Sequence, residues 1–433
     1  MIFFGDFSAI PQHRGGNFMS EISSADTFTV IIEKLLNGGD GLARHDGKTV
    51  FVPCSVPGDE LLVRPVTEKK NFTRAEIVRV LSPGGGRIAP ACPHFGKCGG
   101  CDWQQLEYSR QTETKRLILE ELFHHHFPEI RQLPITMRPS PHSFGYRSRA
   151  RVRIQHHGDR ISVGFFRGSS HIIHDMESCP LFRQRLNETL QKLRQAALNS
   201  NSKAGMREID IACSDEEGMW SCEKSVRATS LRKQVGDFTY AFSPETFFQA
   251  NDFMVGALVE EVMDRVSPDG SRRLEETGSG TALDLYSGVG LFSLPLSQRF
   301  RTVTAVESSR ASSRFCASNA AAARCANISN VCADVAVWLE SPSARSFDCI
   351  VLDPPRAGVA SGVMEKLIRL APGTIIYVSC DPQTLVRDLG RMNPSYYRIE
   401  SITGLDMFPQ TCHFETVVKL VVDHRHTLRK TDS

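Results

Sequence analysis

The chain has 433 residues, 13 cysteines and a formal net charge of only +2. This length allows two or three domains, and the small charge excludes a polybasic tail but not a local basic surface. No apolar run approaches the ~18 residues that a membrane span needs, and the first residues lack the basic and apolar regions of a secretory signal. We therefore predict a cytoplasmic protein with no membrane segment, which begins with a disordered extension over residues 1–25.

Residues 26–82 alternate short apolar runs with glycine-containing turns, such as Gly38–Gly39 and Asp46–Gly47. Short strands separated by such turns are typical of a small β-barrel. The second half of this segment carries five basic residues: Arg64, Lys69, Lys70, Arg74 and Arg79. They suit a solvated barrel surface and an oligonucleotide-binding surface equally well.

Residues 83–245 are predicted to form a central α+β domain that begins with a cysteine-rich loop. Cys92, Cys98 and Cys101 crowd into one short stretch, which indicates a metal or a cluster rather than a framework of disulfides. With a distant fourth ligand, such a set suits either a [4Fe–4S] cluster or tetrahedral zinc, and the spacing does not separate the two. A helix is expected from about residue 106 to residue 127, and it can pack with the catalytic domain.

A run of arginines within the central range marks a strand. The segment "YRSRARVRI" places on one face Arg147, Arg149, Arg151 and Arg153, and apolar residues occupy the other face. A charged strand that faces solvent is the plainer interpretation. Because no acidic residue separates the four arginines, we favour a ribbon that contacts RNA phosphates.

Residues 246–433 include a series of continuous apolar strands that alternate with helical stretches, which predicts a buried, largely parallel sheet with helices on both faces. A strand that ends near Leu285 is followed by a turn with Gly288 and Gly290, and the next strand ends in Glu307. Glycines let a ligand approach the backbone, and an acid at this offset suits ribose hydroxyls. Since nothing resembles a pyrophosphate cradle, S-adenosylmethionine fits better than a dinucleotide.

Cys380 lies at the carboxyl end of another apolar strand, just before a helix that Asp381 can cap. Carbon-5 of uracil becomes a nucleophile when a thiolate adds to carbon-6, and a base must later remove the proton from carbon-5. The helix start is expected to lower the pKa of the Cys380 thiol. Glu415, at the start of the last strand, is the candidate base. Each has a plainer interpretation alone, as a packing cysteine or a surface glutamate.

Four motifs occur in order along the second half of the chain: "DLYSGVGLFSLPL", "DPPRAG", "YVSCDPQTLVRDL" and "HFETVVKL". With these motifs the sequence resembles the RNA 5-methyluridine methyltransferases. Upstream, "CPHFGKCGGCDWQQL" resembles the iron–sulfur segment of that family, and residues 26–81 resemble its TRAM barrel. The resemblance extends from about residue 26 to residue 422.

This resemblance implies an α/β fold with a Rossmann-like S-adenosylmethionine methyltransferase domain at 246–433, an OB-like TRAM β-barrel at 26–82 and a central iron–sulfur and RNA-binding domain at 83–245. It implies that Cys380 is the nucleophile and that Glu415 is the base. Five residues are expected to line the S-adenosylmethionine pocket: Gln249, Tyr286, Glu307, Asp334 and Asp353. Four residues are expected to ligate a [4Fe–4S] cluster: Cys92, Cys98, Cys101 and Cys179.

The implied reaction is methylation of uridine carbon-5 in RNA through covalent addition of a cysteine. A loop uridine of 23S ribosomal RNA is the preferred target, transfer RNA is the alternative, and a monomer is expected. A chemically different hypothesis is methylation of an exocyclic amine through the turn formed by Asp353, Pro354 and Pro355, which needs no cysteine. A third hypothesis is an iron–sulfur RNA-binding module whose transferase fold is inactive.

Overall fold

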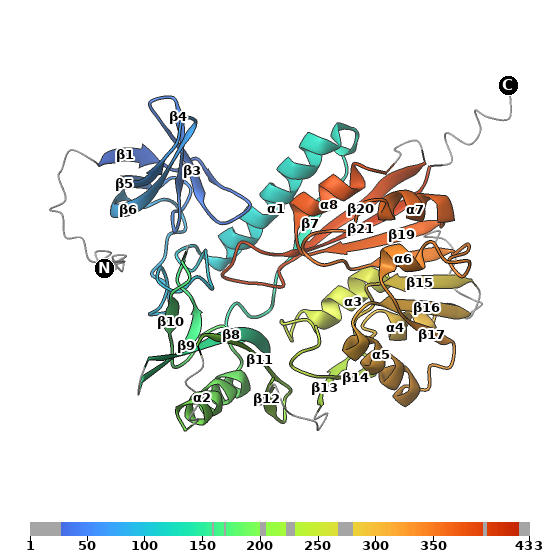
Figure 1. Cartoon of the computed structure of the whole chain (residues 1–433). Helices are drawn as coiled ribbons and strands as arrows, with labels where there is room; N and C mark the ends of the chain where they lie inside the picture. The colour runs from blue at the N-terminus through green and yellow to red at the C-terminus, as the bar shows by residue number, and fades with distance from the viewer. Residues whose placement is uncertain are drawn as a thin grey trace.

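The computed structural model describes residues 27–157, 160–168, 170–199, 205–221, 230–266, 280–392 and 396–423. Figure 1 shows a small N-terminal β unit, a central sheet with one helix, and a large sheet packed between helices. The extension predicted over residues 1–25 lies outside the described residues. Among the residues that are described, no helix is long and apolar enough to cross a membrane.

The N-terminal β unit is a six-stranded sheet in the order β1-β5-β6-β4-β3-β2. Its strands are β1 (Phe28–Ile31), β2 (Lys34–Leu35), β3 (Gly41–His45), β4 (Lys48–Val52), β5 (Glu60–Glu68) and β6 (Phe72–Ser82). Alternate residues point inward, so that Val50 and Val52 of β4 are buried together with Leu61 and Val63 of β5. This alternation is expected of strands with one solvated face.

The central sheet is antiparallel, in the order β10-β9-β8-β11-β12. Its elements are β8 (Arg149–His157), β9 (Arg160–Phe166), β10 (Ile173–Asp175), α2 (Gln184–Leu198), β11 (Arg207–Cys213) and β12 (Gly218–Trp220). The buried face of β8 carries Ala150, Val152 and Ile154, which share an apolar cluster with Leu186 and Leu190 of α2. The predicted division of this strand into an apolar and a charged face is confirmed.

The arginines on the charged face of β8 already have partners within the chain. Arg149 is half-buried and donates hydrogen bonds to three backbone carbonyls between residues 244 and 248. Arg151 donates to Asp210 at 2.9 Å, and Arg153 donates to Glu208 at 2.5 Å, both on the neighbouring strand β11. These pairings weaken the case for a phosphate-contacting ribbon, because that interpretation rested on the lack of acidic residues along the strand itself.

The large sheet has eight strands in the order β17-β16-β15-β18-β19-β21-β20-β7. The strands after residue 280 are β15 (Thr281–Leu285), β16 (Thr302–Glu307), β17 (Ile328–Cys332), β18 (Cys349–Leu352), β19 (Thr374–Ser379), β20 (Tyr397–Leu405) and β21 (Glu415–Val422). The helices of this part are α3 (Val255–Met263), α4 (Ser293–Ser297), α5 (Arg310–Ala322), α6 (Val335–Trp338), α7 (Val363–Leu370) and α8 (Pro382–Leu389). Strands β15 to β19 run parallel, whereas β21 runs antiparallel to both of its neighbours.

Both faces of the large sheet are buried, as the continuous apolar strands predict. Leu283 and Leu285 of β15 and Tyr377 of β19 belong to one apolar cluster. Their neighbours Ala282 and Ile376 belong to a second cluster on the opposite face. This confirms a mixed α/β sheet covered on both sides.

Elements from the range 83–245 also complete the large sheet and its cover. Helix α1 (Tyr108–His126) is followed by a short 3-10 turn (Pro128–Ile130) and β7 (Ile135–Arg138), which pairs in parallel with β20. Leu119 and Phe123 of α1 join an apolar cluster of the large sheet, as expected for a helix that packs with the catalytic domain. The hairpin of β13 (Leu231–Val235) and β14 (Phe238–Phe242) shares the other cluster with α3. The range 83–245 thus contributes to both the central and the large sheet.

Candidate active site

Most candidate residues gather at one edge of the large sheet because parallel strands end on the same side. Tyr286 follows β15, Glu307 ends β16, Asp353 follows β18 and Cys380 follows β19. In open α/β sheets, this carboxyl edge is where ligands bind. Glu415 reaches the same edge from the other direction, because it begins the antiparallel strand β21.

The register between β19 and β21 brings Cys380 and Glu415 together. Ser379 pairs with Thr416, so Cys380 and Glu415 lie at the adjoining ends of the two strands. Cys380 is half-buried, whereas Glu415 is only 3% exposed, and within the described residues its Oε2 atom has no hydrogen-bond partner. An unpaired buried oxygen is costly, and it remains available to a substrate. The structure thus places the thiol and the carboxyl group at the same edge of the sheet, near enough for the charge of Glu415 to act on the thiol.

The electrostatic surroundings of Cys380 disfavour its thiolate. Burial, followed by the nearby carboxyl groups of Glu415 and Asp353, raises the pKa of the Cys380 thiol to about 12, and the guanidinium of Arg356 opposes this shift. The prediction that the helix start lowers this pKa is therefore wrong. Asp381 caps α8 as predicted, since its carboxylate accepts hydrogen bonds from two backbone N–H groups of the first turn at 2.9 and 3.2 Å. That carboxylate adds a further negative charge near the thiol.

Two carboxyl groups of the site also repel each other. Burial, and then the charge of Asp353, raises the pKa of Glu415 well above its usual range, while Arg356 opposes the shift. Burial, and then the charge of Asp284, raises the pKa of Asp353 to about 7. Both carboxyl groups therefore hold a proton to higher pH than a free carboxyl group does. Neutral carboxyl groups weaken the repulsion that a thiolate at Cys380 meets.

Glu307 is held by the backbone of two neighbouring turns. Its Oε2 atom accepts a hydrogen bond from the N–H of Gly288 at 2.9 Å, and its Oε1 atom accepts one from the N–H of Ser309 at 2.6 Å. Tyr286 has a φ of +61° and Gly288 a φ of +56°, so the chain turns sharply at the edge of the sheet, in a conformation that is uncommon for a residue with a Cβ atom. The remaining lone pairs of the carboxylate can accept hydrogen bonds from ribose hydroxyls.

Two buried polar side chains, Gln249 and Ser287, carry oxygen atoms without hydrogen-bond partners among the described residues. These atoms are the Oε1 atom of Gln249, which is 2% exposed, and the Oγ atom of Ser287. Burial, and then the charge of the nearby Asp334, raises the pKa of the Tyr286 hydroxyl to about 12. Asp334 also caps α6 through its Oδ1 atom, which accepts from the N–H of Val337 at 3.1 Å. These features fit a polar ligand such as a nucleoside.

Sequence reasoning assigned no role to three residues beside Cys380. A cleft at Cys380 is lined by Asn37, from the loop between β2 and β3, and by His413, which precedes β21. Arg356 acts electrostatically on both catalytic candidates. Arg356 lies within the "DPPRAG" motif, so that motif was the available signal. The approach of Asn37 depends on tertiary packing, for which the sequence holds no local signal.

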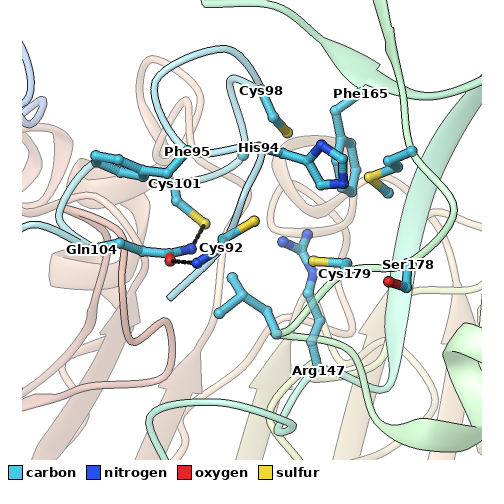
Figure 2. A pocket seen from close by; sticks show the side chains of 13 residues that line it. Cys92, His94, Phe95, Cys98, Cys101, Gln104, Arg147, Phe165, Ser178 and Cys179 are labelled. Carbon is cyan, nitrogen blue, oxygen red and sulfur yellow. Dashed lines mark hydrogen bonds between the residues drawn. The ribbon is translucent and has the colours of Figure 1, made fainter. Parts of the chain in front are cut away.

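The four cysteines that were expected to ligate a cluster surround one pocket (Figure 2). Cys92, Cys98 and Cys101 come from the loop before α1, and Cys179 comes from the segment before α2. All four thiols are free. Gln104 fixes the loop, because its Oε1 atom accepts from the N–H of Cys92 at 3.0 Å and its Nε2 atom donates to the sulfur of Cys101 at 3.2 Å. The structure thus brings together cysteines that are far apart in the sequence.

The chemistry of this pocket suits soft metal ions. Burial raises the pKa of the Cys98 thiol to about 11 and also raises that of Cys179, and the guanidinium of Arg147 opposes both shifts. Thiolates are the ligands of iron–sulfur clusters, and Arg147 would offset part of their charge. In the part of the chain that the structure describes, however, no group of three His, Cys, Asp or Glu side chains has the geometry to hold a metal ion.

Two family models match the chain. Residues 181–335 and 340–422 match the model described as tRNA (uracil-5-)-methyltransferase, and residues 25–78 match the TRAM domain. The 23S rRNA (uracil(1939)-C(5))-methyltransferase RlmD of Pectobacterium carotovorum subsp. carotovorum (strain PC1) is 32% identical over 92% of this chain and 95% of its own length. The enzyme of the same name from Alkalilimnicola ehrlichii is 31% identical over 90% of this chain and 96% of its own length.

A solved structure gives the same result. The crystal structure of Pyrococcus abyssi tRNA (uracil-54, C5)-methyltransferase in complex with S-adenosyl-L-homocysteine matches this chain with a TM-score of 0.70 and 26% sequence identity. The match covers 91% of this chain and 100% of the Pyrococcus abyssi chain. The family resemblance that the motifs indicate is thereby confirmed, together with the methyltransferase fold and the TRAM domain. Since the transferase model matches more than half of the residues and a relative above 30% identity spans almost all of them, this chain belongs to the tRNA (uracil-5-)-methyltransferase family.

Proposed function

We propose that this protein methylates carbon-5 of a uridine in 23S ribosomal RNA, with Cys380 as the nucleophile and Glu415 as the base. The observation that carries the proposal is the register between β19 and β21, which sets the thiol beside a buried carboxyl group with an unpaired oxygen. Family membership supports the reaction class. The names of two relatives at 31% and 32% identity support the RNA target.

In the proposed reaction, the thiolate of Cys380 bonds to carbon-6 of the uracil, and the electrons of the double bond between carbon-5 and carbon-6 become available at carbon-5. Carbon-5 then takes the methyl group, and the bond between that group and the sulfur of its donor breaks. Glu415 removes the proton that remains on carbon-5, the double bond forms again, and the bond between sulfur and carbon-6 breaks to release the thiolate. A target base within a stack must first be flipped out.

The raised pKa of Glu415 suits both steps of this reaction, the attack by sulfur and the removal of the proton. While Glu415 is neutral, it adds no negative charge beside the attacking sulfur. Once the sulfur is a neutral thioether, Glu415 can ionise without facing a thiolate, and a carboxylate with a high pKa is a stronger base toward a carbon-bound proton. Arg356, which opposes the pKa shifts of both groups, favours whichever of them is charged.

S-adenosylmethionine supplies an electrophilic methyl group when it is bound. The proposed pocket for it uses Glu307 for the ribose hydroxyls, and it uses Tyr286 and Asp334 on the side of the adenine. Gln249 and Asp353 complete the pocket toward Cys380. The unpaired Oε1 atom of Gln249 and the unused lone pairs of Glu307 support this assignment.

We also propose that the four-cysteine pocket holds a [4Fe–4S] cluster, with Cys92, Cys98, Cys101 and Cys179 as its ligands. The gathering of four free thiols around one pocket supports this. The cluster would tie residues 92–104, which we call the cysteine loop, to the segment before α2. The methylation chemistry needs no electron from the cluster. Protein purified without oxygen is expected to be brown, and the Cys92→Ser variant is expected to lose this colour. Colourless wild-type protein with one bound zinc would favour the tetrahedral zinc alternative.

The catalytic assignment is tested by trapping the covalent intermediate. The Glu415→Gln variant is expected to form the bond between Cys380 and RNA but to release product slowly, so that a protein–RNA band accumulates on a denaturing gel. The Cys380→Ala variant is the matched control and is expected to lose both the band and methyl transfer. Retained methylation in that variant would instead favour methylation of an exocyclic amine through the turn that begins at Asp353.

The RNA target is tested by mass mapping of ribosomal and transfer RNA from a strain that lacks this protein. The expected result is the loss of one or more methyl groups from 23S ribosomal RNA. Loss from transfer RNA alone would favour the alternative target, which the name of the Pyrococcus abyssi enzyme supports.

A further inference from the structure

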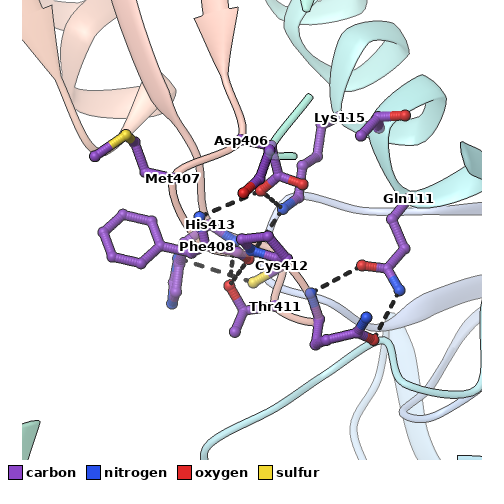
Figure 3. A network of polar contacts seen from close by, with 12 residues as sticks. Gln111, Lys115, Asp406, Met407, Phe408, Thr411, Cys412 and His413 are labelled. Carbon is purple, nitrogen blue, oxygen red and sulfur yellow. Dashed lines mark hydrogen bonds and ion pairs between the residues drawn. The ribbon is translucent and has the colours of Figure 1, made fainter. Parts of the chain in front are cut away.

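The loop between β20 and β21, residues 406–414, leads directly into the first residue of β21 and is held from outside by α1 (Figure 3). We call it the base loop. Lys115 of α1 forms a buried ion pair with Asp406 at 2.6 Å. Gln111, one turn earlier in α1, accepts from the backbone N–H of Gln410 at 2.9 Å and donates to its Oε1 atom at 3.0 Å. These ties fix the beginning and the middle of the base loop.

The cysteine loop holds the end of the base loop through Asp102. The backbone N–H groups of Asp102 and Trp103 both donate to the carbonyl of Gln410 at 3.1 Å. The Oδ2 atom of Asp102 accepts from the N–H of Cys412 at 3.0 Å. Asp102 directly follows Cys101, so the four-cysteine pocket and the base loop are joined by one short, hydrogen-bonded segment.

We propose that Asp102 is a positioning residue for the base Glu415. Its carboxylate fixes the backbone at residue 412, three residues before Glu415, and it makes no contact with the reacting atoms. The inference rests on the proposed function, because it assigns Asp102 to one step of that reaction.

The geometry separates the two chemical steps. Cys380 directly follows β19, which is paired on both sides, with β18 and with β21. Glu415 is the first residue of β21: it pairs with Leu405 of β20, but the register with β19 ends one residue later, at Thr416. The base loop leads directly into Glu415, so it can shift this residue at the end of its strand. Loss of the tie from Asp102 is expected to slow proton removal from carbon-5, whereas attack by the thiol changes little. A misplacement of about 1 Å can slow a chemical step about 100-fold.

The test compares Asp102→Ala with Asp102→Asn in the full chain, purified without oxygen and assayed for iron content. Single-turnover reactions with S-adenosylmethionine and a 23S ribosomal RNA fragment that the wild type methylates are quenched in detergent, and the protein–RNA band is followed as it appears and decays. For Asp102→Ala, we expect the band to appear within about threefold of the wild-type rate and to decay about 10- to 100-fold more slowly. The asparagine variant is expected to restore the decay, because its Oδ1 atom still accepts from the N–H of Cys412.

Equal slowing of both steps would assign Asp102 a merely structural role and overturn the inference. Unchanged decay would overturn it too, as would an asparagine variant as slow as the alanine variant. If Asp102→Ala does not fold, Asp102→Ser replaces it in the same comparison, because the serine hydroxyl is too short to reach the N–H of Cys412. If the wild type methylates RNA but forms no covalent band, the proposed function fails instead, so the two failures are distinguishable.

Discussion

The buried ion pair between Lys115 and Asp406 allows a test of stability whose size follows from the structure. Both side chains are 0% exposed, and 2.6 Å separates the Nζ and Oδ1 atoms. Methionine in place of Lys115 keeps most of the volume but leaves the Asp406 carboxylate charged and unpaired in the interior. An uncompensated buried charge of this kind costs about 3–5 kcal/mol. We expect the free energy of unfolding of α1 and the large sheet to fall by that amount.

The measurement is urea unfolding of the full chain, followed by the fluorescence of its tryptophans, because the Trp103 ring lies 5.7 Å from the ammonium of Lys115. The Lys34→Met variant is the matched control. Lys34 pairs with Glu121 of α1, but the two side chains are 43% and 65% exposed, and such a pair contributes about 0–1 kcal/mol. Adding Asp406→Leu to Lys115→Met is expected to recover most of the loss, because no charge remains buried. A loss in Lys115→Met no larger than that in Lys34→Met would refute the reasoning.

Three further predictions concern cysteine reactivity, RNA binding and the cysteine loop. The pKa of the Cys380 thiol is raised to about 12, so its thiolate fraction, and with it the rate of alkylation by iodoacetamide, is expected to rise about tenfold per pH unit between about pH 7 and 9. Mass spectrometry measures this alkylation, with the exposed Cys332 as the internal control. A rate that does not change with pH would contradict the raised pKa. The Arg151→Ala variant is expected to keep the salt dependence of RNA binding, because Arg151 is paired with Asp210 at 2.9 Å. If the slope of the logarithm of the binding constant against the logarithm of the salt concentration fell in magnitude by about one, Arg151 would contact a phosphate. Cys101→Ser is expected to slow the decay of the covalent band, since residue 101 anchors the segment that holds the base loop, and unaltered decay would exclude a role for that thiol.

The edge of the sheet that carries the candidate residues could be predicted from the sequence, because reactive and polar side chains follow or end several of the apolar strands. Glu307, Asp353 and Cys380 each stand at the end of an apolar strand, and parallel strands end at one edge of their sheet. Glu415 was a candidate as the first residue of the last predicted strand, and the order of the family motifs supported its role. Its approach to Cys380 depends on the register of an antiparallel pair, and a slip by one residue would turn Glu415 to the other face. Local sequence does not encode that register.

Pairings between distant segments were beyond sequence reasoning. The acids that neutralise the arginines of β8 come from β11, and Lys115 and Asp406 are 291 residues apart. The pKa of Cys380 was misjudged for the same reason. A helix start is visible in the sequence, whereas the burial of the thiol and the approach of Glu415 and Asp353 are consequences of tertiary packing.

The matched transferase range begins at residue 181, yet the ties on the base loop come from Asp102, Gln111 and Lys115, which precede it. The proposed reacting groups, Cys380 and Glu415, therefore lie in the transferase part, while the preceding segments hold the loop that leads into Glu415. The cleft at Cys380 includes Asn37 of the N-terminal β unit as well. A displacement of the cysteine loop would be passed to Glu415 through the base loop, because Asp102 is hydrogen-bonded to Cys412. No such tie joins Asp102 to Cys380 among the described residues, and Cys380 follows a strand that is paired on both sides. The N-terminal β unit and the cysteine loop therefore both help to shape the proposed active site.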